Sequence, residues 1–173
     1  DEADIIKTDG DFIYAVSKNN LFIVDATPAN NASIVSKIEF KSTPNNIFIN
    51  KDRLVVYGVD DDFYNSDFRR HSSYTFFKVF DIADKKNPKQ VRDLDFEGNL
   101  TNSRMIGDYV YFITSNYQYY IEDEPVLPRV IEDGDVVANT CSGEEKCFAP
   151  EVYYFDVPYN SYNFTSVYAV NIL

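Results

Sequence analysis

Carboxylate side chains are the residues of this sequence best suited to chemistry, and they gather in two stretches. The first stretch, residues 58–73, sets four acidic residues against Arg69 and Arg70: Asp60, Asp61, Asp62 and Asp67. Clustered carboxylates supply the hard oxygen ligands that calcium prefers, so these four are candidate Ca²⁺ ligands. Their spacing does not match the twelve-residue loop of an EF-hand. Apart from calcium we expect no cofactor.

The second stretch, residues 115–151, is also strongly acidic and contains only Arg129 and Lys146 as basic residues. Its acidic residues are Glu122, Asp123, Glu124, Glu132, Asp133, Asp135, Glu144, Glu145 and Glu151. Connections longer than about 12 to 15 residues are uncommon in compact domains unless they are functional or disordered. We therefore expect both stretches to form an acidic, loop-decorated face that binds a protein, a glycan or a cation. Solvated decoration without a ligand is the alternative.

The two cysteines, Cys141 and Cys147, lie in the second acidic stretch and are separated by five residues. With no other cysteine in the chain, we expect them to form a disulfide in an oxidising compartment. A zinc site needs four ligands, and the only histidine, His71, belongs to the other stretch. A nucleophilic pair of cysteine and histidine is a remote alternative.

Charge and composition exclude several classes of protein. The 173 residues carry a formal net charge of −12, which would repel a nucleic acid, because phosphate binding needs clustered cations. No apolar run approaches the roughly 18 to 20 residues that a membrane span requires. Hydrophobic residues make up 45% of the chain, enough for a well-packed core. We expect no nucleic-acid partner and no membrane span.

An internal repeat emerges when short turns that contain aspartate are aligned. Each turn precedes an apolar run typical of a buried strand, and the turn aspartates are Asp11, Asp52 and Asp108. A second apolar run that ends in aspartate follows in every copy, and these strand-end aspartates are Asp25, Asp81 and Asp156. The separation from a strand-end aspartate to the next turn aspartate is 27 residues both times. The repeat therefore has a constant framework, and its length varies only in the acidic stretches.

Each copy also contains an inner strand before the turn and an outer strand after the strand-end aspartate, so it predicts a four-stranded unit. No segment shows the apolar spacing of an amphipathic helix, and we predict an all-β chain. Antiparallel four-stranded units of this kind are typical of the blades of a β-propeller. The predicted blades span about residues 3–40, 45–96 and 103–173. Closed propellers have about 4 to 8 blades, so we interpret residues 1–173 as one incomplete propeller, either with missing blades or as part of a homo-oligomer.

Four strings in the sequence resemble a family of secreted bacterial and archaeal β-propellers that are distantly related to WD repeats. They lie at residues 1–10, 80–88, 103–111 and 152–156. The resemblance implies a secreted or cell-surface location and supplies no catalytic residues. WD repeats have a Trp-Asp pair at the end of the third strand, whereas this chain has no Trp.

We expect the strand-end aspartates to be structural, because their carboxylates can accept hydrogen bonds from the backbone of the following turn. The favoured function is an extracytoplasmic binding or interaction module without catalysis. A hydrolase or lyase that uses paired carboxylates is one alternative, since function does not follow from fold. A purely structural cell-surface segment is the other.

Overall fold

The computed structural model describes residues 1–60, 73–119, 127–137, 151, 153, 156 and 161–173 of an almost entirely β chain. Its strands are β1 Ile6–Thr8, β2 Phe12–Ser17, β3 Asn20–Asp25, β4 Ser33–Glu39, β5 Pro44–Asn50, β6 Arg53–Asp60, β7 Tyr74–Asp81, β8 Lys89–Glu97, β9 Asn99–Ile106, β10 Tyr109–Tyr119, β11 Val130–Glu132, β12 Asp135–Val136 and β13 Ser161–Asn171. One 3₁₀ turn, η1, covers Ala29–Asn31. The prediction of an all-β chain is confirmed. No helix in the described part of the chain is long and apolar enough to cross a membrane.

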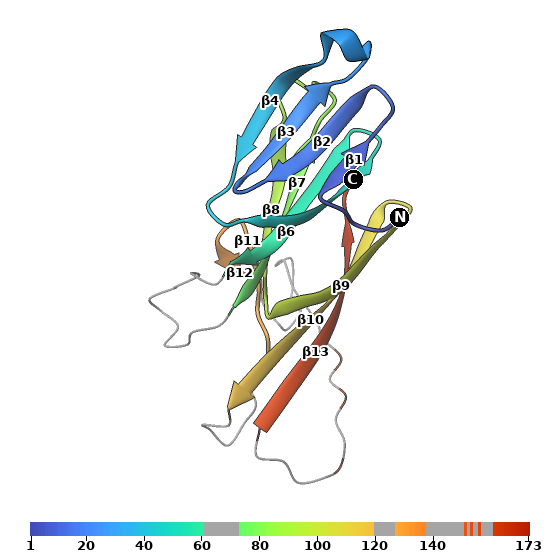
Figure 1. Cartoon of the computed structure of the whole chain (residues 1–173). Helices are drawn as coiled ribbons and strands as arrows, with labels where there is room; N and C mark the ends of the chain where they lie inside the picture. The colour runs from blue at the N-terminus through green and yellow to red at the C-terminus, as the bar shows by residue number, and fades with distance from the viewer. Residues whose placement is uncertain (61–72, 120–126, 138–150, 152, 154–155, 157–160) are drawn as a thin grey trace.

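The strands form three antiparallel sheets (Figure 1). The first sheet has the order β1-β2-β3-β4, and the third has the order β13-β10-β9. The second sheet contains the predicted strands β5 to β8 and is extended at its outer edge by β11 and β12, in the order β12-β11-β8-β7-β6-β5. Part of the second acidic stretch, predicted as loop, is therefore a hairpin on the outer edge of the second sheet.

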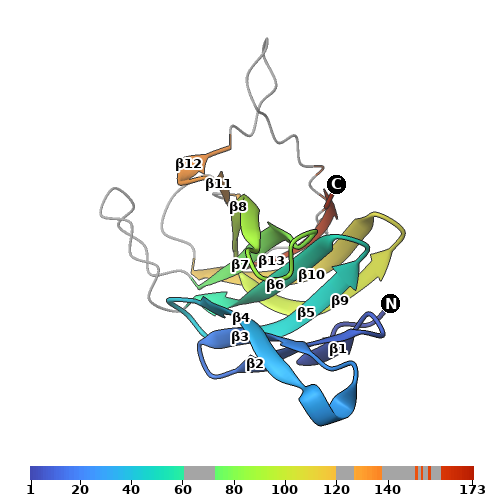
Figure 2. The same ribbon diagram turned by 90° about the horizontal axis from the view of Figure 1, so that it is seen from above.

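The second sheet lies between the other two, and both of its faces are buried (Figure 2). One face packs on the first sheet through a cluster that includes Tyr14, Leu21 and Phe76. The opposite face packs on the third sheet through a cluster rich in aromatic rings, in which Phe77 stacks on Phe112 with ring centroids 5.5 Å apart. The central strands read as continuous apolar runs because they are covered on both sides.

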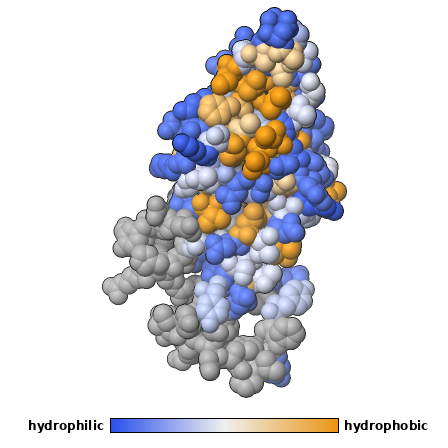
Figure 3. Space-filling model, viewed as in Figure 1, coloured by the Kyte–Doolittle hydropathy of each residue, from blue (hydrophilic) through white to orange (hydrophobic). Residues whose placement is uncertain are grey.

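The first and third sheets each bury one face and leave the other open. Figure 3 shows apolar side chains gathered over the open face of the first sheet. The third sheet exposes Ile106, Tyr109, Tyr111 and Val167 on its open face. Three sheets stacked in this way, with an open face at each end of the stack, form an incomplete propeller.

Candidate functional site

Two of the predicted strand-end aspartates, Asp25 and Asp81, end β3 and β7. Asp81 Oδ1 accepts a hydrogen bond from the backbone N–H of Ala83 at 2.9 Å, and Asp25 Oδ1 accepts one from Thr27 at 3.4 Å. The Ala83 N–H, together with the Arg53 guanidinium 2.9 Å away, holds the pKa of Asp81 below its ordinary value. Both carboxylates are thus engaged by the turn that begins the outer strand.

In the third sheet, the position equivalent to Asp25 and Asp81 is occupied by Asn171, and not by the predicted Asp156. Asn171 lies opposite Tyr109 in the register, as Asp81 lies opposite Arg53, and its Oδ1 accepts the N–H of Leu173 at 3.0 Å. Asp156 is exposed and lies in a bend outside the strands. The assignment of Asp156 was therefore wrong. A search for aspartate alone missed an asparagine that can accept the same hydrogen bond.

The backbone confirms this correction, because the residue after each strand end donates to the turn residue of the same sheet. Ala26 N–H donates to Asp11 in the first sheet, and Ile82 N–H donates to Asp52 in the second. In the third sheet Ile172 N–H donates to Asp108 at 3.0 Å. Strand β13 therefore holds the position of β3 and β7, although we had predicted an outer strand there.

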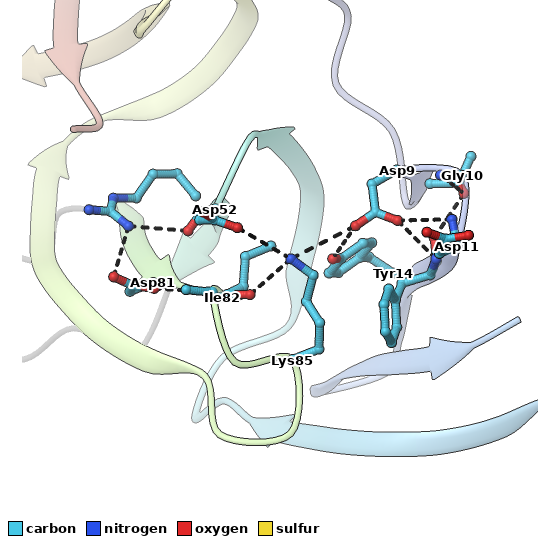
Figure 4. A network of polar contacts seen from close by, with 12 residues as sticks. Asp9, Gly10, Asp11, Tyr14, Asp52, Asp81, Ile82 and Lys85 are labelled. Carbon is cyan, nitrogen blue, oxygen red and sulfur yellow. Dashed lines mark hydrogen bonds and ion pairs between the residues drawn. The ribbon is translucent and has the colours of Figure 1, made fainter. Parts of the chain in front are cut away.

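A polar network around Lys85 joins the first sheet to the second (Figure 4). Lys85 Nζ lies 3.6 Å from Asp52 Oδ1 and 3.9 Å from Asp9 Oδ2, and it donates to the carbonyl of Ile82 at 2.9 Å. Tyr14 donates to Asp9 Oδ2 at 2.8 Å. Burial raises the pKa of Asp9, but hydrogen bonds from Phe12 and Tyr14 outweigh it, so the net pKa is lowered. A lysine between two carboxylates makes this network a structural link rather than a cation site.

The predicted calcium ligands lie mostly outside the described residues, as do His71 and both cysteines. Of the four ligands only Asp60 is described, and it ends β6 opposite Tyr74. Among the residues with described coordinates, no three acidic, histidine or cysteine side chains are grouped as metal ligands. Calcium binding at Asp60, Asp61, Asp62 and Asp67 stays a prediction.

Among the described carboxyl groups, that of Asp95 on β8 has the most strongly raised pKa. Burial, together with the negative charges of Asp93 and Asp60, raises its pKa from 3.8 to about 6. Its neighbour Asp93 forms an ion pair with Lys78, with 2.5 Å between Nζ and Oδ2. The positive charge of Lys78 offsets only part of this effect, so the net pKa of Asp95 stays raised, and Asp95 does not line the hollow described below.

Arg92 on β8 fixes the hairpin that extends the second sheet. Its Nη2 lies 3.0 Å from Glu132 Oε1 on β11, and its Nη1 donates to the carbonyl of Asn171 at 2.9 Å. Asp133 N–H donates to the carbonyl of Asp93 at 2.9 Å. One guanidinium therefore connects the hairpin, the second sheet and the end of β13.

On the open face of the third sheet, side chains are exposed at positions whose equivalents are buried in the other two sheets. Tyr111 lies three residues after its turn aspartate and is 40% exposed, whereas Tyr14 and Val55 at the equivalent positions are buried. Val167 lies four residues before its strand end and is 70% exposed, whereas Leu21 and Phe77 at the equivalent positions are buried. In both other sheets these residues pack against the next sheet. We call the open side of β9, β10 and β13 the third-sheet face.

A hollow of about 570 Å³ opens at the inner side of the third-sheet face, beside β9. Its lining mixes amide, hydroxyl and apolar groups and includes Asn46, Asn102, Ser103 and Tyr111. Glu2 is the one acidic residue among the described residues that line it, and its Oε1 lies 2.5 Å from Arg104 Nη2. The described lining of the hollow thus offers polar contacts, aromatic rings and a single carboxylate, that of Glu2.

Comparison with known families gives one match. A family model described as a beta propeller domain matches residues 1–173. Searches of the curated proteins and of the solved structures give no significant match. The expected β-propeller family is confirmed by this match over residues 1–173, whereas a secreted location and a relation to WD repeats stay predictions.

Proposed function

Because this chain belongs to the beta-propeller domain family, we propose that it is a non-catalytic interaction module whose third-sheet face binds another protein surface. The observation that carries the proposal is the exposure of Tyr111 and Val167 at positions that are buried in both other sheets. Exposed apolar patches on otherwise polar proteins mark interaction sites. Tyrosines are enriched in such interfaces because one end of the ring is apolar and the other polar.

The charges of the described residues support binding over catalysis. The hollow beside β9 contains a single carboxylate, that of Glu2, and Arg104 neutralises it. Hydrolases and lyases with paired carboxylates need a second acid nearby whose pKa differs from that of the first. The third-sheet face instead resembles the faces that already join the sheets of this chain.

The proposal includes an extracytoplasmic location. The resemblance of residues 1–10 and 103–111 to secreted propellers supports it, as does the pair Cys141 and Cys147, which suits an oxidising compartment. The acidic stretches would then face the outside of the cell, where a protein, a glycan or calcium could meet them.

Selection of peptide ligands on the immobilised chain tests the proposal. A phage-displayed peptide library is enriched on the chain, and the affinities of the enriched peptides are measured by biolayer interferometry. We expect Val167→Asp, which places a charge on the third-sheet face, to weaken binding by about tenfold or more. Val91→Asp is the matched control, because Val91 is 49% exposed but lies on β8, outside the face. Equal affinity for both variants would contradict the proposed binding surface.

A further inference from the structure

The first sheet has an open face that complements the third-sheet face. Ile13 and Ile34 on this side are 37% and 63% exposed, and Ile6 is exposed beside them. Ile13 lies two residues after its turn aspartate, where Leu54 and Val110 are buried in the other two sheets. We call the open side of β1, β2, β3 and β4 the first-sheet face (Figure 3).

Each open face is one half of a contact that the chain already makes twice. The second sheet uses Leu54 to meet the first sheet, and the third sheet uses Val110 to meet the second. In return, the first sheet presents Tyr14 to the second, and the second presents Val55 to the third. The third-sheet face therefore corresponds to the side of a sheet that packs on the next sheet in the chain. The first-sheet face corresponds to the side that packs on the preceding sheet.

The charges of the two faces allow them to meet despite the acidic composition of the chain. On the first-sheet face, Lys37 Nζ lies 3.5 Å from Glu39 Oε2. On the third-sheet side, Arg104 is paired with Glu2. Among the described residues, each face thus carries an ion pair of opposite charges, so the described side chains do not concentrate negative charge on either face.

We propose that the partner of the third-sheet face is the first-sheet face of a second copy of this chain. This inference rests on the proposed function, since it names the partner of the same surface. Two such head-to-tail contacts related by a two-fold axis join three sheets of one copy to three of the other. The resulting ring of six sheets falls within the range of about 4 to 8 blades in closed propellers.

Sedimentation velocity of the full chain tests the assembly. We expect a species with twice the mass of the 20.0 kDa chain, whose dissociation constant rises by about tenfold or more in Val167→Asp and in Ile34→Asp. Val91→Asp, with its charge on the second sheet, should associate like the parent chain. Far-ultraviolet circular dichroism of every variant separates loss of association from loss of folding.

Mixing the two variants tests the head-to-tail geometry. In a mixed pair, Val167→Asp supplies an intact first-sheet face and Ile34→Asp supplies an intact third-sheet face. One of the two contacts is therefore restored, and the mixture should associate more tightly than either variant alone. A contact between two third-sheet faces would instead leave Ile34→Asp fully associated.

Three results would overturn the inference. The first is a parent chain that stays monomeric at all concentrations. The second is loss of association in Val167→Asp but not in Ile34→Asp, which would retain the third-sheet face as a binding surface and reject the second copy's first sheet as its partner. The third is a series of species that keeps growing with concentration, which would reject the closed pair. Peptide binding at the third-sheet face in a monomeric chain would leave the proposed function standing alone.

Discussion

At the scale of single residues, short polar side chains act mainly on the backbone next to them. Asp25, Asp81 and Asn171 each accept a backbone N–H two residues further along the chain. An amide oxygen accepts this hydrogen bond as a carboxylate does, which explains why the repeat tolerates either residue. Asp95 differs from them, because burial and two like charges oppose its ionisation.

Replacing Asn171 tests the corrected register. We expect Asn171→Ala to lower the free energy of unfolding by about 1 kcal/mol, because the turn loses its side-chain acceptor. Asn171→Asp should retain the stability of the parent, and Asp156→Ala should change it by less than about 0.5 kcal/mol, as for other exposed sites. Urea unfolding followed by circular dichroism measures all three. Greater destabilisation by Asp156→Ala than by Asn171→Ala would restore the original assignment.

Asp95 should make stability depend on pH. Its pKa is about 6 in the folded chain against an ordinary value of 3.8, so the folded chain binds a proton that the unfolded chain releases. The resulting stabilisation is fully present below about pH 4 and is lost as the pH rises through about 6. At pH 7.5, Asp95→Asn should therefore be more stable than the parent by about 1 to 2 kcal/mol, after allowance for solvent screening.

Urea unfolding at pH 4 and pH 7.5 measures this difference, which should shrink at the lower pH. Asp93→Asn is the matched control on the same strand. It removes both the ion pair with Lys78 and the negative charge beside Asp95, and because these two effects oppose each other it should gain less stability at pH 7.5 than Asp95→Asn. An Asp95→Asn variant that gains nothing at pH 7.5 would show that Asp95 is well solvated.

At the scale of elements, the hairpin of β11 and β12 protects a sheet edge. Outer strands present unpaired N–H and C=O groups that invite aggregation, and a short added strand covers them. The register pairs Val130 with Phe96 and Glu132 with Leu94, which places the hairpin over part of the outer edge of β8. Arg92 then connects the hairpin to β13.

Loss of the Arg92 side chain should loosen the hairpin without unfolding the sheets. In Arg92→Met we expect hydrogen exchange at Asp133 and Val137 to accelerate by about fivefold, because local opening becomes easier by about 1 kcal/mol. Both N–H groups donate to backbone carbonyls in the parent. Arg104→Met, which breaks the pair with Glu2, is the matched control and should leave these amides unchanged. Equal acceleration in both variants would show a general loss of stability.

At the scale of the whole molecule, the described residues leave one apolar face exposed on the first sheet and one on the third, and the proposed association depends on these two faces. The aromatic cluster between the second and third sheets, with Phe77 on Phe112 and Phe96 on Tyr168, packs these two sheets against each other. Rigid apolar faces lose little conformational entropy on binding, which favours assembly through sheet-to-sheet contacts.

Whether the predicted disulfide forms tests the proposal that the protein works in an oxidising compartment. Without reductant, thiol titration of the denatured chain should detect no free thiol from Cys141 and Cys147, and reduction should release both. Because the closed loop is short, reduction should cost at most about 2 to 3 kcal/mol and leave the sheets folded. Both thiols free in chain prepared under oxidising conditions would contradict the disulfide and weaken the extracytoplasmic proposal.

The sequence by itself determined the all-β fold class, the turn aspartates and the order of the strands in the first two sheets. These features depend on local patterns, namely apolar runs, turn residues and a constant spacing from Asp25 to Asp52 and from Asp81 to Asp108. Sheets 1 and 2 follow the expected order from β1 to β4 and from β8 to β5. The family resemblance rested on the same local strings.

Only the tertiary structure decided which apolar run occupies the third position of the third sheet. Residues 152–156 and 166–172 both look like strands, and their sequences alone do not say which one pairs with β10. The choice depends on non-local packing, since Tyr168 and Val170 in β13 join the cluster around Phe77 and Phe112. Likewise, the exposure of Tyr111 and Val167 appears only when the neighbours of each face are known. Register and burial depend on residues far apart in the chain, which local patterns do not encode.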